Sequence, residues 1–178
     1  SSSMTILKKD QKKKDFDHLS VLERFKIQMD NSKVKTKYSL KPDFSWAGTD
    51  VSRIVNKYFG KKFILIFPFC SPKLSHKKWP FFNDLIKIIK SKHFNLEIAV
   101  APGPNEMEEA NKIEAVKITN NDKSLSITEL TGLIMKASYI IANDTGPAHI
   151  AAHVDKKGTV LFGHHTTPEN VSIETDKF

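Results

Sequence analysis

The chain has 178 residues, a length typical of one domain, and 39% of them are hydrophobic. No uninterrupted apolar run approaches the roughly 20 residues that a membrane-spanning helix needs. The N-terminus, "SSSMTILKKDQKKKD", lacks the apolar centre of a signal peptide, and "SSSM" resembles a cloning remnant before Met4. The single cysteine, Cys70, excludes an intrachain disulfide and fits a reducing compartment. These features favour a cytoplasmic globular protein.

The net charge of +8 is unevenly distributed along the chain. Residues 1–62 hold 15 Lys/Arg and 7 Asp/Glu, whereas residues 63–178 hold 13 of each. The neutral second part argues against a nucleic-acid-binding core. The lysine-rich stretches "KKDQKKKD" and "KVKTKYSLK" are typical either of a solvated surface or of a contact with an anionic membrane. The residues alone leave both interpretations open.

The first third of the chain is predicted to be a basic leader and a helical lead-in. Residues 1–15 have the composition of a disordered segment. Apolar residues at nearly helical spacing predict one helix within residues 16–30, and a polar extended connector follows over 31–47. A second helix is predicted over 48–60, with Asp50 as its N-cap and Gly60 as its stop.

From residue 63 onward, short apolar strands alternate with helical patterns. Strands are predicted at 63–67, 96–101, 115–119, 138–142 and 158–162. Helices are predicted at 79–93 with Pro80 at its start, 105–113, 126–137 with Ser126 and Glu129 as a capping box, and 146–154. This alternation predicts an α/β domain over residues 63–178, a Rossmann-like parallel sheet flanked by helices on both faces. Residues 164–178 show no closing helix, so we expect the domain to be truncated at its C-terminus.

Ligands of such sheets bind beyond the carboxyl ends of the strands. That rule selects the segments 68–79, 102–106, 119–126 and 143–149, all of which are rich in polar residues. In "NDTGPAH", Asp144 ends a strand, Thr145 and Gly146 form the turn, and Pro147 fits the first turn of a helix. The N–H groups of a helix start attract phosphates, Gly146 allows close approach, and Asp144 can accept hydrogen bonds from sugar hydroxyls. The alternative is that Asp144 or Thr145 merely caps the helix.

His149 and His153 are four residues apart and could share one face of the helix. Residue 150 is Ile rather than the Glu of a zinc-protease helix, and a third ligand would have to come from His164 or His165, without supporting spacing. The pattern therefore does not predict a metal site. His149, one turn into the helix, can face the ligand cleft, whereas His153 is expected to be structural or exposed.

Two further loops carry candidate binding residues. In "FPFCSPKLSHKKWP", Ser71 and Ser75 supply hydroxyl groups and Lys77 and Lys78 supply charge that can face a diphosphate. In "APGPNEMEE", Glu106 could accept hydrogen bonds from a ribose. The alternatives are a surface of solvated lysines and a carboxylate placed favourably at a helix start. Cys70 has no evident base beside it and is not expected to be a nucleophile.

Together, "KKWP", "PGPNE", "KSLSITELTGLIMKASYIIANDTGPAHIAA" and "TVLFG" resemble the C-terminal domain of glycosyltransferase family 9, the heptosyltransferases of lipopolysaccharide core synthesis. The resemblance covers roughly residues 63–168. It implies the C-terminal half of a GT-B glycosyltransferase, in which a second Rossmann-like domain completes the active site. It also implies a donor such as ADP-L-glycero-D-manno-heptose, a lipopolysaccharide-core acceptor and no metal or other cofactor.

The resemblance also implies roles for individual residues. Asp144 would hold sugar hydroxyls, and the Thr145 and Gly146 backbone the diphosphate. His149 belongs to the same turn, Lys77 would contact phosphate, Glu106 the adenosine ribose, and Ser71 would be the upstream hydroxyl residue. The family's general base lies in the N-terminal domain, and no residue here fits that role. The resemblance therefore implies that this chain alone binds the donor without turning it over. A non-catalytic nucleotide-binding module with a basic docking leader is the alternative function.

Overall fold

A computed structural model describes residues 16, 18–37, 40–60, 62–164 and 166–178. The predicted leader 1–15 and His165 lie outside these described residues. Five strands form one fully parallel sheet in the order β3-β2-β1-β4-β5. They are β1 (Phe63–Phe67), β2 (Glu97–Val100), β3 (Val116–Lys117), β4 (Tyr139–Asn143) and β5 (Gly158–Leu161). The Rossmann-like parallel sheet predicted from the sequence is confirmed.

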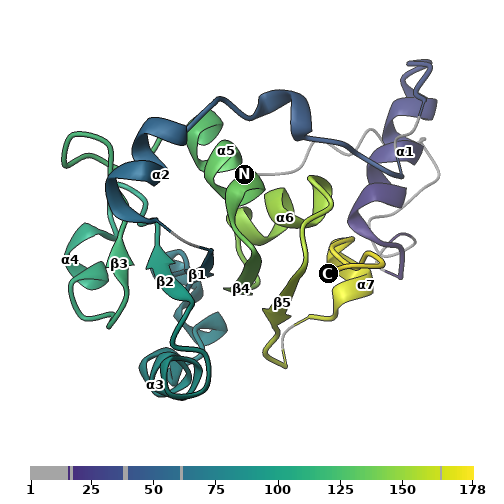
Figure 1. Cartoon of the computed structure of the whole chain (residues 1–178). Coiled ribbons are helices and arrows are strands. Elements are labelled where there is room, and N and C mark those ends of the chain that lie inside the picture. The colour runs from purple at the N-terminus through teal and green to yellow at the C-terminus, as the bar shows by residue number, and fades with distance from the viewer. Residues whose placement is uncertain (1–15, 17, 38–39, 61, 165) are drawn as a thin grey trace.

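Helices cover both faces of the sheet, as Figure 1 shows. One face carries α2 (Ser52–Tyr58), α5 (Ile127–Lys136) and α6 (Gly146–His153), and the other carries α3 (Phe82–Lys92) and α4 (Met107–Ala110). The central strand β1 is buried along its whole length because alternate side chains enter two cores. Phe63, Leu65 and Phe67 join the α5 and α6 side, whereas Ile64 and Ile66 join the α3 side. A strand buried on both faces needs this continuous apolar run.

The lead-in packs against the C-terminal part of the chain. Helix α1 (Val21–Asn31) has Ser20 as its N-cap, which forms a capping box with Glu23. The helix lies beside α7 (Pro168–Val171) in Figure 1. The Leu22 N–H donates to the Ser172 hydroxyl at 3.0 Å. The connector is then fixed on α6, where the Phe44 N–H donates to the His153 carbonyl at 2.9 Å.

Several predicted boundaries were wrong, for local physical reasons. Val51 rather than Asp50 is the N-cap of α2, and Asp50 accepts from the Ser52 N–H from one residue further out. Pro80 precedes α3, whose N-cap is Phe81. The helix predicted at 105–113 shrinks to α4, the strand at 115–119 shrinks to β3, and the connector contains a 3-10 turn at Ser45–Ala47. A short helix, α7, also forms within the C-terminal stretch for which none was predicted.

Other predictions held closely. The strand at 63–67 agrees with β1, and the capping box of Ser126 and Glu129 forms at the start of α5.

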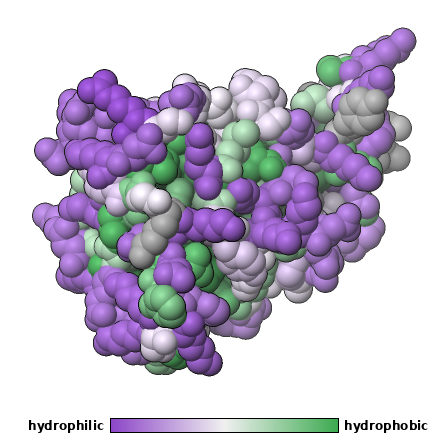
Figure 2. Space-filling view, in the orientation of Figure 1, coloured by the Kyte–Doolittle hydropathy of each residue, from purple (hydrophilic) through white to green (hydrophobic). Residues whose placement is uncertain are grey.

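The surface seen in Figure 2 is mainly hydrophilic, with smaller hydrophobic areas between the hydrophilic ones. Among the described residues, no helix has the length and apolar character needed to cross a membrane.

Candidate functional site at the carboxyl ends of the strands

The site lies at the topological switch point of the sheet, where the strand order reverses between β1 and β4. Strands β1 and β4 are neighbours, but β1 continues toward α3 on one face and β4 continues into α6 on the other. The segments that leave these two strands therefore diverge, and this switch point is the usual ligand position in open parallel sheets. We call the place between the two segments the crevice. Residues 68–79 follow β1, and residues 144–149 follow β4.

Asp144 is the centre of the site. It directly follows β4, and only 5% of its surface is exposed. Lys77, at the end of the 3-10 helix η3 (Pro72–Lys77), places its Nζ 2.5 Å from Asp144 Oδ2. His149, in the first part of α6, places its Nε2 3.6 Å from the other carboxylate oxygen. The fold thus brings together three of the sequence-predicted residues from three separate elements.

His149 is held in its neutral form. Burial lowers the pKa of its imidazole, and the nearby charge of Asp144 only partly opposes that effect. Because the ordinary value is already below 7, a lowered pKa leaves the ring neutral at neutral pH. A neutral imidazole can either donate or accept a hydrogen bond, so His149 can serve a polar ligand without adding charge.

The start of α6 is open to a ligand. Thr145 is the N-cap residue, but its side chain does not cap the helix and instead donates to the Asn143 carbonyl at 3.3 Å. Gly146 is exposed, and a Cβ built on it would meet no atom within 4 Å. The helix start therefore presents backbone with its positive dipole end beside Lys77, an arrangement suited to an anion.

Glu106 lies on the neighbouring segment that leaves β2. Its carboxylate accepts the Gly103 N–H at 2.8 Å, and burial raises its pKa, with Glu109 adding to the rise. Lys78 forms an ion pair with Glu109 of α4, so the second of the two lysines ties residues 68–79 to the β2 side. Lys77 therefore pairs with a residue after β4, whereas Lys78 pairs with a residue on the β2 side.

Ser71 stands apart from this group. It is the exposed residue before η3, and its carbonyl accepts the Leu74 N–H at 2.8 Å. The neighbouring Cys70 thiol donates to the Leu74 carbonyl at 3.2 Å, and burial raises its pKa. A raised thiol pKa leaves little thiolate at neutral pH, which argues against nucleophilic chemistry at Cys70.

Asn143 is a site residue that the sequence reasoning missed. This last residue of β4 is fully buried, and its amide contacts both Pro68 and Trp79. One signal was available in the sequence, because an amide that follows the apolar run of residues 140–142 must find hydrogen-bond partners when it is buried. Which partners it finds depends on the tertiary structure.

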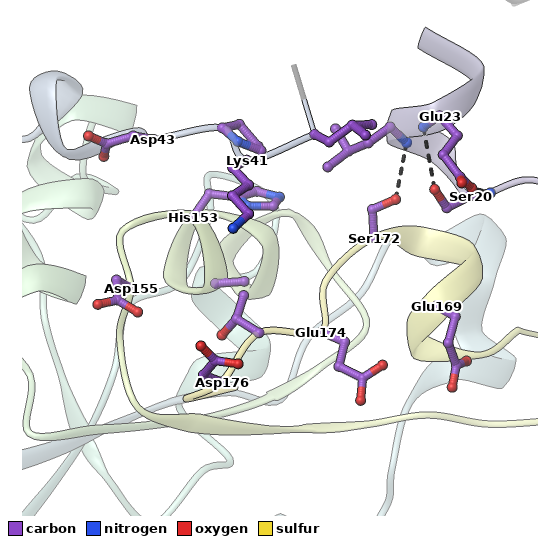
Figure 3. A pocket seen from close by; sticks show the side chains of 15 residues that line it. Ser20, Glu23, Lys41, Asp43, His153, Asp155, Glu169, Ser172, Glu174 and Asp176 are labelled. Atoms are coloured by element: carbon purple, nitrogen blue, oxygen red, sulfur yellow. Dashed lines mark hydrogen bonds between the residues drawn. The ribbon is translucent and has the colours of Figure 1, made fainter. Parts of the chain in front are cut away.

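A second hollow, shown in Figure 3, has the wrong charge for a phosphate ligand. This cavity of about 660 Å³ lies at the far end of α6, between the lead-in and the C-terminal residues. Its lining includes one lysine, Lys41, and six carboxylates: Glu23, Asp43, Asp155, Glu169, Glu174 and Asp176. His153 also lines it and makes an edge-to-face contact with Phe44, with ring centroids 5.4 Å apart, which fits the structural role predicted for it.

Among the described residues, no group of three or more His, Cys, Asp or Glu side chains is placed to hold a metal ion. The cationic partners available in the crevice are instead Lys77 and the start of α6. Both belong to the chain itself and can compensate the charge of a diphosphate.

The chain is similar to known proteins in sequence and in fold. The chain is similar over 121 residues to the lipopolysaccharide core heptosyltransferase OpsX of Haemophilus influenzae, with 31% identity, 63% of this chain and 34% of that protein covered. The fold is similar to E. coli ADP-heptose lps heptosyltransferase II, with a TM-score of 0.64 and 17% identity over 89% of this chain and 52% of that one. E. coli heptosyltransferase WaaC, solved with ADP, gives a TM-score of 0.59 and 18% identity over 84% and 46%.

The chain thus spans about a third of the curated relative and about half of each solved structure. At 17–18% identity, the structural similarities establish the fold alone: the chain has the fold of one half of a GT-B glycosyltransferase. The family model of glycosyltransferase family 9 (heptosyltransferase) matches residues 3–174, which is nearly the whole chain. The chain therefore belongs to glycosyltransferase family 9, the heptosyltransferases.

Proposed function

We propose that this chain binds the nucleotide-sugar donor of an inverting heptosyltransferase that acts on the lipopolysaccharide inner core. The observation that carries the proposal is the buried Asp144 at the crevice between β1 and β4, with Lys77 and His149 beside its two oxygens. The similarity to a protein named as a lipopolysaccharide core heptosyltransferase supports the substrate class. ADP-L-glycero-D-manno-heptose is the donor that we expect.

Each group has a task in this proposal. Lys77 and the N–H groups at the start of α6 face the diphosphate, and Gly146 allows it to approach the backbone. Asp144 accepts hydrogen bonds from the sugar hydroxyls, with neutral His149 beside it. Glu106, whose second oxygen is not used by the Gly103 N–H, accepts from the ribose, and Ser71 supplies a hydroxyl from the segment after β1.

The reaction is a single displacement at the anomeric carbon. The acceptor hydroxyl loses its proton to a base as its oxygen forms the new glycosidic bond, and the bond to the diphosphate breaks with ADP as the leaving group. Lys77 and the helix start stabilise the charge that develops on ADP. We assign the base to a part of the enzyme beyond these residues, and so expect the 178-residue chain to bind donor without transferring heptose.

A titration of ADP-heptose and of ADP tests the proposal. We expect the unaltered chain to bind both and Asp144→Asn to weaken ADP-heptose more than ADP, because the amide keeps the volume but loses acceptor strength toward the sugar. Asp155→Asn, at the far end of α6, is the matched control and should leave both affinities unchanged. Equal loss of ADP and ADP-heptose in Asp144→Asn would instead favour a plain nucleotide-binding module.

A peripheral contact with the cytoplasmic face of an anionic membrane is a second proposal. It is favoured by the concentration of the whole net charge of +8 in residues 1–62. A lipid-linked acceptor would give such a contact a purpose, because it holds the enzyme at the surface that carries the substrate. Sedimentation of the chain with vesicles that contain an anionic lipid tests it.

A further inference from the structure

The side-chain amide of Asn143 connects both ends of one loop to the end of β4. Its Nδ2 donates to the Pro68 carbonyl at 2.8 Å, and its Oδ1 accepts the Trp79 N–H at 3.2 Å. Pro68 directly follows β1, and Trp79 lies three residues before the first residue of α3. The two partners fix the orientation of the amide, because a carbonyl needs a donor and an N–H needs an acceptor. One fully buried side chain thus closes residues 68–79 into a loop.

Within the loop, the Leu74 N–H donates to the Ser71 carbonyl and the Lys78 N–H to the Ser75 carbonyl; these bonds shape η3 but do not join it to the sheet. Residues 71–76 are exposed, and η3 is interrupted at Leu74, where φ is −124° and ψ is 34°. Lys77 is two residues before Trp79, and its Nζ must reach Asp144, the residue next to Asn143. The position of Lys77 therefore depends on where Trp79 is held, together with the ion pair of Lys78 to Glu109.

We infer that Asn143 is a positioning residue that fixes the 68–79 loop so that Lys77 stays over the Asp144 corner. The inference deepens the proposed function, on which it rests, because it takes the diphosphate of the donor as the ligand of Lys77. Asn143 itself touches no donor atom and acts through the loop. Without its amide, the Pro68 carbonyl and the Trp79 N–H lose their buried partner, and the loop gains freedom to carry Lys77 away.

The fluorescence of Trp79 can report on the position of the loop without any ligand. The chain has two tryptophans, and the other, Trp46, is 82% exposed, so Trp46→Phe leaves Trp79 as the single fluorophore at little structural cost. Trp79 is half-buried and makes edge-to-face contacts with Phe81 and Phe82. In this background, Asn143→Ala should increase quenching of Trp79 by acrylamide and weaken ADP binding by roughly tenfold.

In Asn143→Asp, the two hydrogen bonds of residue 143 can be restored within one protein by lowering the pH. An ionised carboxylate repels the Pro68 carbonyl, whereas a protonated one can donate to it and still accept the Trp79 N–H. The quenching and the ADP affinity of Asn143→Asp, each compared with the unaltered chain at the same pH, should therefore approach normal as the pH falls. This comparison also serves if Asn143→Ala fails to fold.

The control variant is Ile134→Val, fully buried on the opposite face of the sheet. It should lower the melting temperature without changing Trp79 quenching or ADP affinity. Unchanged Trp79 quenching in Asn143→Ala would overturn the inference, and so would a released Trp79 with unchanged ADP affinity. If the unaltered chain bound no ADP, the proposed function would fail, while Trp79 quenching would still decide whether Asn143 restrains the loop.

Discussion

Asp144 shows how a buried charge can remain available for binding. Its side chain is 3% exposed, and an isolated carboxylate at that depth would be costly. Lys77 compensates the charge at one oxygen, and neutral His149 lies beside the other without adding a second positive charge. The corner can therefore accept hydrogen bonds from a polar ligand while the loop lysine faces an anion.

A substitution at Gly146 separates an effect on ligand binding from an effect on folding stability. A Cβ at this position meets no protein atom within 4 Å, so Gly146→Ala should leave the free energy of unfolding nearly unchanged. It should nevertheless weaken ADP binding by roughly tenfold, because the added methyl group projects where we propose that the diphosphate approaches the backbone. Calorimetric titration and urea unfolding of the same samples measure both quantities. Unaltered affinity in Gly146→Ala would place the diphosphate elsewhere.

His149 and His153 predict an acid-sensitive stability. Burial lowers both imidazole pKa values from the ordinary 6.5, so the unfolded chain takes up these protons more readily than the folded one. Their contribution is complete above about pH 6.5 and is lost as the pH falls through the folded-state values.

Urea unfolding between pH 5 and 8 measures this loss. The double variant His149→Gln/His153→Gln should show a shallower decrease in the free energy of unfolding than the unaltered chain. His93→Gln, at an exposed residue outside α6, is the control and should keep the original slope. The difference between chains also removes the opposite contribution of Glu106, whose pKa is raised by burial.

At the scale of elements, close backbone contact joins the lead-in to α5. The Thr49 N–H donates to the Thr128 carbonyl at 3.1 Å, and Gly132 allows the chain at Thr49 to lie directly on the helix. A Cβ on Gly132 would be 2.1 Å from the Thr49 carbonyl oxygen, an approach that no flexible side chain can relieve. This glycine is therefore required by packing, although glycine is a poor helix former.

Gly132→Ala should destabilise the chain by about 1–3 kcal/mol, because the backbone clash outweighs the roughly 1 kcal/mol that alanine gains in helix propensity. Gly60→Ala is the matched control, since a Cβ there meets nothing within 4 Å. Urea unfolding compares the two variants. A stabilised Gly132→Ala would show that the Thr49 segment leaves the helix in solution.

The elements that could be predicted from sequence are those with strong periodicity. Continuous apolar runs and helical spacing located β1, α5 and α6, and the strand-end rule indicated that the loops carrying Lys77 and Asp144 would meet. The contacts within that crevice could not be predicted, because neighbouring Lys77 and Lys78 are chemically identical and only the loop path separates their partners. Asn143 was missed because its partners, Pro68 and Trp79, are more than sixty residues away.

At the scale of the whole molecule, charge and fold are separated along the chain. Residues 63–178, which contain the whole sheet, are neutral, and the excess of eight positive charges precedes them. The crevice therefore has only local cations for a diphosphate, and the long-range field of the chain comes from the N-terminal third. Such a field acts on surfaces and is screened within about 10 Å at 0.1 M salt.

The chain should sediment with vesicles that contain phosphatidylglycerol at low ionic strength and dissociate as salt is added, with little binding to neutral phosphatidylcholine vesicles. A variant with glutamine at Lys8, Lys9, Lys12, Lys13 and Lys14 should lose most of this binding, since each lysine near the surface contributes about 1 kcal/mol. The matched control has the same net charge, with glutamine instead at the exposed lysines 73, 87, 92, 112 and 157. Equal loss in both variants would mean that net charge alone acts, without a contact by the leader.

Lys77 and Lys78 have different ion-pair partners, and this restricts where the chain can gain or lose residues. Lys77 pairs with Asp144 and Lys78 with Glu109, so an insertion between Lys77 and Trp79 would move the lysines away from their partners. The exposed stretch from Ser71 to His76 lies upstream of both ion pairs, so a change in its length leaves the spacing from Lys77 to Trp79 unaltered. In aligning relatives of this chain, the spacing from Lys77 to Trp79 should therefore be kept fixed, and gaps should be placed upstream of it.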